Sequence, residues 1–104
     1  MDLAALQKRL QTFADERDWN RFHSPKNLAM ALSVEAAELV EIFQWLTEAE
    51  SSSLDSAQRQ ALADEIADVQ IYLLRIAHIT GVDIESAVEN KLEKNARKYP
   101  PQSG

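Results

Sequence analysis

The sequence predicts an all-α protein with one domain, residues 1–104, and three observations support this. Apolar residues recur at spacings of three and four along extended segments, which is the periodicity of an amphipathic helix. Gly and Pro are scarce, with 2 and 3 copies, and they lie near the ends of these segments. The length of 104 residues suits a single small domain that buries only part of its apolar surface.

The first two helices follow from apolar spacing and from a capping residue. The spacing predicts a first helix over Leu3 to about Asp18,. A second helix is expected to begin at Pro25, because the Ser24 side chain can cap it and proline is accepted at the first helical position. It should continue to about Thr47, after which the three serines at 51–53 predict a loop.

Two more helices complete the expected fold. The third should begin near residue 55 or 56 and end at Thr80, where Gly81 can adopt the left-handed conformation that ends many helices. Asp83 is expected to cap the fourth helix, which Pro100 and the proline after it stop. Residues 98–104 are expected to form a flexible C-terminal tail.

Composition and charge exclude several classes of function. The formal net charge of -6 argues against a nucleic-acid polymer as a partner, because phosphate backbones are bound by clusters of Lys and Arg. No apolar run approaches the roughly 20 residues that cross a membrane. The N-terminal segment resembles neither a signal peptide nor a transit peptide, and Cys is absent, which excludes disulfides and thiolate zinc sites. We therefore expect a soluble protein in the cytoplasm that binds no membrane.

The second predicted helix carries carboxylates where apolar residues are expected. Glu35 falls within its apolar stripe, and Glu38 and Glu41 follow at successive spacings of three, on neighbouring positions of the same face. The apolar members of that stripe are Leu28, Leu32, Leu39, Ile42, Phe43 and Leu46. A carboxylate in such a stripe is costly to bury unless a partner compensates its charge.

The third predicted helix repeats this arrangement. Glu65 and Asp68 share one side with Tyr72, beside a second apolar stripe. Four gathered carboxylates would repel one another unless a cation lies between them, and hard oxygen ligands favour magnesium or manganese over zinc or copper. A di-iron site would require His three residues after Glu, which neither His23 nor His78 provides. The alternative is that these carboxylates are solvated or pair with Lys and Arg.

Several motifs together resemble the MazG-like nucleotide pyrophosphohydrolases, in particular the short dCTP pyrophosphatase branch. They are the run E-A-A-E-L-V-E-I-F-Q-W at 35–45, the run D-E-I-A-D-V at 64–69, and Lys91, Asn95 and K-Y-P at 98–100. The likeness extends over nearly the whole chain, from R-D-W at 17–19 through F-H-S-P-K-N-L at 22–28 to Tyr99 and Pro100. A single E-x-x-E pair is unspecific, whereas the ordered combination is not.

The resemblance implies a four-helix bundle-like MazG fold that assembles as a homo-oligomer. It also implies a magnesium-dependent enzyme, with Mn²⁺ as a substitute ion, that hydrolyses a nucleoside triphosphate to monophosphate and pyrophosphate. The substrate expected from this branch is dCTP or a modified dCTP, in cleansing of the nucleotide pool. The metal ligands implied are Glu35, Glu38, Glu65 and Asp68. Either Glu38 or Glu41 would take the proton of the attacking water, and the sequence does not decide between them.

The resemblance also assigns the substrate contacts. It implies that Lys91, Asn95 and Lys98, which share one face of the last helix, approach the phosphates. It implies that the base lies near Trp19, His23, Trp45 and Tyr72. Without the resemblance, basic residues near a helix C-terminus would be ascribed to the helix dipole. The two Trp would be ascribed to the core or to an interface, and His23 to a structural role. The position of Tyr72 alone suits a core residue or a cleft residue equally.

Assembly into a homodimer or homotetramer is expected for a second reason. Ile71 and Leu74 lie opposite the main apolar stripe of the third helix, so one four-helix layer would leave apolar surface exposed. Two other functions remain open: a non-catalytic module that senses a nucleotide through an acidic cleft, and a purely structural bundle. The preferred base and the number of metal ions are not decided by the sequence.

Overall fold

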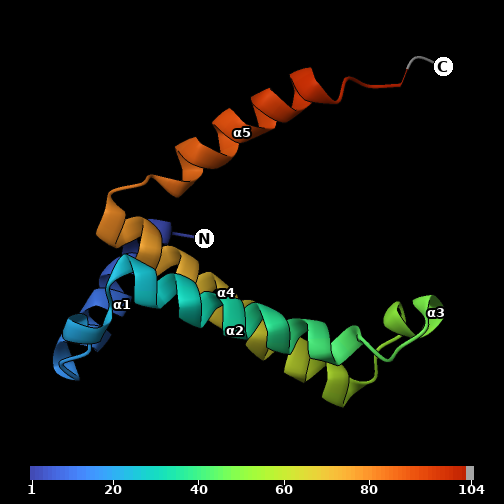
Figure 1. Ribbon diagram of the computed structural model, residues 1–104, viewed down its shortest axis with the longest axis horizontal. Helices are drawn as coiled ribbons and strands as arrows, with labels where there is room; N and C mark the ends of the chain where they lie inside the picture. The colour runs from blue at the N-terminus through green and yellow to red at the C-terminus, as the bar shows by residue number, and fades with distance from the viewer. Residues whose placement is uncertain (103–104) are drawn as a thin grey trace.

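The computed structural model describes residues 1–102, and within that range it contains helices and no strand. The elements are α1 (Leu3–Glu16), the 3₁₀ helix η1 (Asn20–Phe22), α2 (Pro25–Phe43), α3 (Glu48–Ser51), α4 (Ser56–Thr80) and α5 (Ile84–Lys98). The predicted all-α class is confirmed. The helices α2 and α4 lie side by side in opposite directions, α1 packs on α4, and α5 extends away from this group (Figure 1).

The two ends of α4 are the best predicted feature of the fold. At its start, the Asp55 carboxylate accepts the backbone N–H of Gln58, and the Gln58 side chain accepts the backbone N–H of Asp55. This reciprocal capping box satisfies two backbone donors that a helix start leaves free. At its end, Gly81 has a φ of 76°, the left-handed conformation that glycine adopts without steric cost.

The helix α1 ends two residues before the predicted position, at Glu16. The cause is Asp18, whose φ is 55° and which no longer continues the helix. The backbone N–H of Trp19 then bonds the carbonyl of Ala14 at 2.9 Å, and that of Asp18 bonds the carbonyl of Asp15 at 3.3 Å. These two bonds form a Schellman motif with Asp in place of the usual Gly, and they turn Trp19 back towards α1.

The prediction that the second helix reaches Thr47 is wrong, because α2 ends at Phe43. Thr47 instead caps the additional short helix α3, in which Thr47 and Glu50 form a second capping box. The T-x-x-E pattern that encodes it is visible in the sequence. Ser51 belongs to α3, so the predicted serine loop begins only at Ser52.

The helix α5 begins after Asp83 and ends at Lys98, close to the predicted bounds. The Asp83 side chain makes no bond to the backbone there and instead accepts the hydroxyl of Ser86 at 2.6 Å. Of the predicted tail 98–104, Lys98 closes the helix and residues 103–104 lie outside the described range. The expected flexibility of this tail therefore stays a prediction.

The core is small and lies where α1, α2 and α4 meet. Its buried apolar side chains are Ala14, Leu28, Leu74 and Ala77. The expectation that Leu74 faces outward is wrong, because its side chain is only 4% exposed on the side of α4 that α1 covers. Ile71 is 38% exposed, as expected. A core of this size gives a single chain little stability of its own.

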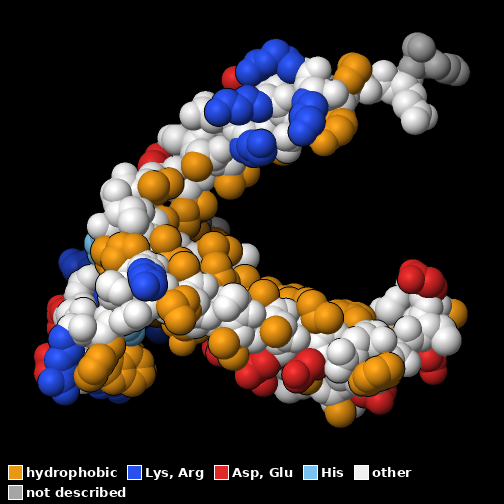
Figure 2. All heavy atoms as spheres, viewed as in Figure 1, with side chains coloured by type: hydrophobic (Ala, Val, Ile, Leu, Met, Phe, Trp, Pro, Cys, Tyr) orange, Lys and Arg blue, Asp and Glu red, His pale blue; other side chains and the backbone are white. Residues whose placement is uncertain are grey.

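A large apolar surface remains uncovered on the concave side of the molecule. Figure 2 shows apolar side chains along α4 and the start of α5, around an open hollow. The radius of gyration is 17.0 Å, whereas a compact domain of this length has about 13 Å. Leu73, Val82 and Val88 are exposed and line a groove of this surface, and the exposed Leu92 lies one turn after Val88 on the same face of α5,. None of the described helices is both long enough and apolar enough to cross a membrane.

Candidate metal and nucleotide site

The antiparallel pairing of α2 and α4 brings three predicted metal ligands together. Glu35 and Glu38 lie one turn apart on α2, and Glu65 faces them from α4. One carboxylate oxygen from each of the three lies within 4.8 Å of the others. With Asp68, whose charge reaches Glu35 and Glu65, these residues form what we call the acidic cluster.

The acidic cluster perturbs its own ionisation. The proximity of Glu65, with which Glu35 can share a proton, raises the pKa of Glu35 from 4.5 to about 7, and burial and the charges of Glu38 and Asp68 add to this. Burial also raises the pKa of Glu65, and the same two charges act in that direction, although the contact with Glu35 opposes them. Like charges close together disfavour the ionised form. The raised pKa values of Glu35 and Glu65 therefore indicate that no positive partner among the described residues offsets the carboxylates.

The hydrogen bonds and ion pairs of residues 1–102 supply no such partner. The Oε2 atoms of Glu35 and Glu65 are both buried and accept no hydrogen bond. The ion pairs in this range are Arg17 with Glu16 and Arg21 with Asp18, and none includes the acidic cluster. Buried unpaired carboxylate oxygens are costly, and a hard divalent cation is the ligand that satisfies them. The donor set therefore fits a metal ion.

Glu41, the other candidate for the general base, lies beside this cluster. It lines a shallow hollow of about 430 Å³ together with Glu38, Glu65 and Asp64. Asp64, the first residue of the run D-E-I-A-D-V, adds a carboxylate at the mouth of the site. Spacing could have indicated it, because Asp64 and Asp68 lie one turn apart on α4.

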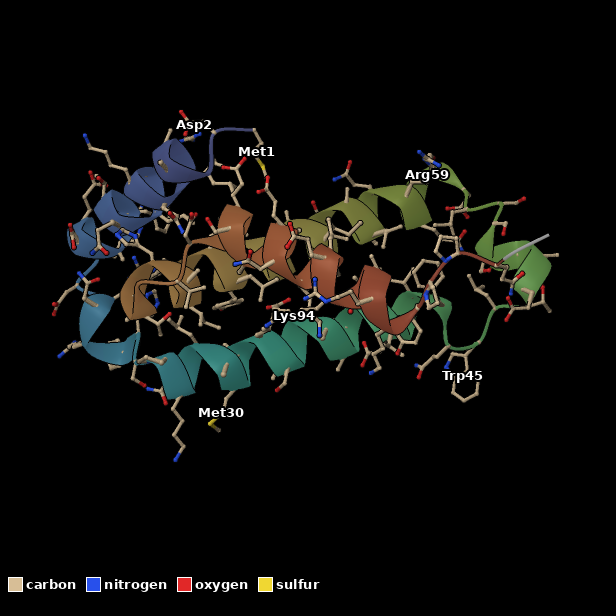
Figure 3. The ribbon with its side chains drawn as sticks, turned by 90° about the horizontal axis from the view of Figure 1, so that it is seen from above. Met1, Asp2, Met30, Trp45, Arg59 and Lys94 are labelled. Carbon is tan, nitrogen blue, oxygen red and sulfur yellow. The ribbon has the colours of Figure 1, made fainter. Side chains whose placement is uncertain are left out.

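The predicted base-binding residues do not meet within one chain. Trp19 and His23 precede α2, with their rings 6.0 Å apart, whereas Trp45 follows α2 and is 86% exposed. Figure 3 shows Trp45 pointing outward beside the end of α2. The 19 residues of α2 separate the two groups by about 28 Å at the rise of an α-helix. Tyr72 is half-buried on α4 between them.

The predicted phosphate-binding residues are also separated from the acidic cluster. Lys91, Asn95 and Lys98 lie on α5, and Figure 2 shows the basic side chains of this helix across the hollow from α2 and α4, the two helices that carry the acidic cluster. Lys91 lines a groove of about 480 Å³ between the end of α4 and the start of α5. One chain therefore presents acidic and basic halves of a site without joining them.

Sequence reasoning missed Arg75, which is the one buried charged residue among those described. Its side chain is 3% exposed and it lies seven positions after Asp68 on α4. Seven residues make about two helical turns, so Asp68 and Arg75 share a face. The signal was an arginine inside the apolar run Y-L-L-R-I-A at 72–77, which a solvated surface would not explain.

Comparisons with known proteins match most of the chain. Residues 30–104 match the MazG-like family. The chain is 46% identical over 90 residues to dCTP pyrophosphatase 1 of Homo sapiens and 44% identical over 90 residues to that of Rattus norvegicus. Each match covers 85% of this chain and 53% of the relative, so the chain spans about half the length of these curated relatives.

A solved structure resembles the whole chain. The crystal structure of a pyrophosphatase from Archaeoglobus fulgidus superimposes with a TM-score of 0.91 and 41% sequence identity. The match covers 97% of this chain and 94% of that one, so α5 and the acidic cluster lie within the shared fold. The family match, the sequence relatives and this structure lead to one assignment: the chain belongs to the MazG-like family.

Proposed function

We propose that the protein is a nucleoside triphosphate pyrophosphohydrolase that depends on a divalent cation. The reaction is NTP + H₂O → NMP + pyrophosphate. The observation that carries this proposal is the acidic cluster, in which two buried carboxylate oxygens, from Glu35 and Glu65, lack any partner in the described chain. Unpaired buried carboxylate oxygens would destabilise a purely structural pair of helices. They can instead coordinate a divalent cation that also binds the triphosphate.

Each acidic side chain then has a role. Glu35, Glu38, Glu65 and Asp68 hold the cation, for which Mg²⁺ is the proposed ion and Mn²⁺ a substitute. When bound, the cation supplies positive charge that polarises the phosphoryl oxygens and makes the attacking water more acidic. Glu41, or an oxygen of Glu38 not engaged by the cation, accepts the proton of that water.

The proposed substrate is dCTP or a modified dCTP, and the proposed purpose is cleansing of the nucleotide pool in the cytoplasm. Two relatives at about 44–46% identity carry the name dCTP pyrophosphatase 1. In this chain, the rings of Trp19 and Trp45 offer faces on which a base can stack, which favours binding without selecting a particular base. His23 and Tyr72 supply polar groups for selection.

The complete site requires two copies of the chain, in a homodimer or homotetramer. The acidic cluster, the basic arm of α5 and the two Trp lie apart within one chain. A second copy seated in the apolar hollow would bury side chains such as Val88 and Leu92, which are 52% and 62% exposed, and would offer its own cluster to Lys91, Asn95 and Lys98. Burial of apolar surface drives such association.

Product analysis tests the reaction. Purified protein with MgCl₂ is incubated with each common and modified triphosphate, and pyrophosphate and orthophosphate are measured separately. We expect pyrophosphate as the product, with dCTP or a 5-modified dCTP as the best substrate. Release of orthophosphate alone would contradict the proposal, and binding of a triphosphate without hydrolysis would support the non-catalytic sensor instead.

Complementation tests the shared site. Glu38→Gln and Lys98→Ala are each expected to be nearly inactive, because they remove the acidic and the basic half. Mixing the two after reversible dissociation should restore part of the activity, since each mixed dimer contains one intact site and one site with both defects. Equal inactivity of the mixture and of its components would show that each chain supplies its own complete site.

A further inference from the structure

The buried guanidinium of Arg75 lies outside the acidic cluster and has no role in the proposed reaction. Its Nη1 donates to Gln11 Oε1 at 2.8 Å, and its Nη2 donates to Asn20 Oδ1 at 3.2 Å and approaches His23 Nδ1 at 3.3 Å. These contacts reach α1 and both ends of η1 from α4. We call Arg75, Gln11, Asp15, Asn20 and His23 the polar network.

The direction of every hydrogen bond in the polar network can be assigned from Arg75. A guanidinium only donates, so Gln11 and Asn20 must present their carbonyl oxygens to it. Their amide nitrogens then donate to Asp15 Oδ1, at 2.8 and 2.6 Å, and Gln11 Nε2 also donates to Asn20 Oδ1 at 2.9 Å. Both bonds to Asp15 lower its pKa, to which the charge of Arg75 adds. The network is thus anchored by one cation and one anion, and Nε of Arg75 is its one buried nitrogen without a partner among the described residues.

The same rule determines the protonation of His23. Because Nη2 can only donate, Nδ1 of His23 must accept with its lone pair, and the proton of the neutral ring must be on Nε2. Burial, and then the charge of Arg75, lower the pKa of His23, which keeps the ring neutral at neutral pH. Arg75 on α4 therefore imposes the tautomer of His23 that carries its proton on Nε2.

The segment that Arg75 contacts is the proposed base-binding segment. The Schellman motif at Asp18 turns Trp19 back, so that its ring packs edge-on against Phe13 at 5.4 Å. The ring of His23 lies 6.0 Å from that of Trp19. Through α4, Arg75 links this segment to the acidic cluster, because Asp68 and Arg75 lie on one face of that helix.

We propose that Arg75 is a positioning residue, which holds the Trp19–His23 segment on α4 and makes His23 present an Nε2–H donor to the base. The recognised feature is a hydrogen-bond acceptor, such as the carbonyl oxygen or the unprotonated ring nitrogen of a cytosine. This inference rests on the proposed function for its substrate, whereas the tautomer of His23 does not depend on that function.

The tautomer is measured first, on the full chain without substrate. The chain has 2 His residues, so His78→Gln leaves His23 as the only source of imidazole ¹⁵N signals. We expect the proton on Nε2 alone in this protein, and a mixture of both tautomers after Arg75→Met is added. A proton on Nδ1 in the His78→Gln protein overturns the inference, whether or not any Arg75 variant folds.

Kinetics then test the consequence for the substrate. Arg75→Met should raise KM for dCTP roughly tenfold with kcat nearly unchanged. The lost contact to the base would weaken binding of the substrate and of the transition state equally. Arg75→Lys, which keeps a donor, should recover part of that affinity. An Arg75→Met protein with native helicity and unchanged KM, or with a reduced kcat alone, contradicts the positioning role.

A matched control separates this effect from the loss of any arginine. Arg59 is exposed at the opposite end of α4 (Figure 3), and Arg59→Met should change neither KM nor the tautomer. If the unmodified protein hydrolyses no triphosphate, the proposed function fails. The tautomer of His23 still decides whether Arg75 imposes its protonation.

Discussion

The helix α4 withdraws charged side chains from water at two places, and the partners differ. Towards its C-terminal end, Arg75 is buried, but three acceptors surround its terminal nitrogens and Asp15 balances its charge through two amides. Near its middle, Glu65 meets Glu35 and Glu38 with no cation among the described residues. One buried charge is compensated by the protein itself, and the other requires a ligand.

This difference separates a structural role from a binding role. In the polar network both terminal nitrogens of Arg75 have acceptors and only its Nε lacks a partner, so these bonds make the packing of α1 and η1 on α4 specific. An unsatisfied group of like charges destabilises the protein until a cation binds. Neutralising a member of the acidic cluster should therefore raise the free energy of unfolding of the metal-free protein. Removing a member of the polar network should lower it.

The largest expected effect is on catalysis. Glu38→Gln or Asp68→Asn should reduce kcat by roughly 100-fold or more, because each removes a charge that holds the cation. Circular dichroism should show unchanged helicity. Glu89→Gln, on the exposed surface of α5, is the control and should retain full activity. A fully active Asp68→Asn enzyme would exclude Asp68 from the site.

The polar network gives the next largest effect, on stability. Gln11→Ala should lower the free energy of unfolding by about 1–3 kcal/mol, since it leaves the Nη1 donor of the buried Arg75 unsatisfied. Urea unfolding of the metal-free protein measures this change. Gln60→Ala, which removes one exposed bond to Asp64, should cost well under about 1 kcal/mol. Equal losses in both variants would refute the special role of the network.

Cation binding to the acidic cluster should stabilise the folded protein. At a free Mg²⁺ concentration about ten times Kd, the free energy of unfolding should rise by about 1.4 kcal/mol, which a thermal melt detects as a shift in Tm. The rise should saturate with Mg²⁺ and disappear in Glu38→Gln. If Tm stays constant in Mg²⁺, the purely structural reading of the carboxylates gains support.

The smallest effect is the pH dependence of stability without metal. The pKa of Glu35 is raised from 4.5 to about 7 in the folded protein, so the folded state holds a proton that the unfolded chain releases between these values. Stability from this group is therefore full below pH 4.5 and is lost as the pH rises through 7,.

Urea unfolding at several pH values, compared with Glu35→Gln, isolates this contribution. The variant should lose less stability than the natural chain between about pH 5 and pH 8. The lowered pKa of His23 acts with the opposite sign, since its contribution falls as the pH drops below 6.5, and both proteins share it. A natural chain that instead gains stability towards pH 8 relative to the variant would contradict the raised pKa.

Local signals allowed most helix bounds to be predicted from the sequence. The N-caps at Ser24 and Asp55, the proline at helix position one and the glycine at 81 act through their immediate neighbours, which is why a sequence pattern specifies them. The missed elements were also local. The left-handed Asp18 and the Thr47 capping box used residues that adopt these conformations less regularly than Gly or Pro do.

The chemistry of the acidic cluster also followed from the sequence, because a carboxylate in an apolar stripe conflicts with burial wherever the helix packs. The tertiary structure alone decided which carboxylates meet, that Leu74 is buried under α1, and that Arg75 contacts His23 across 52 positions. Periodicity specifies a face of one helix, but the pairing of faces depends on packing between segments distant in the chain, and a single sequence carries no direct record of it.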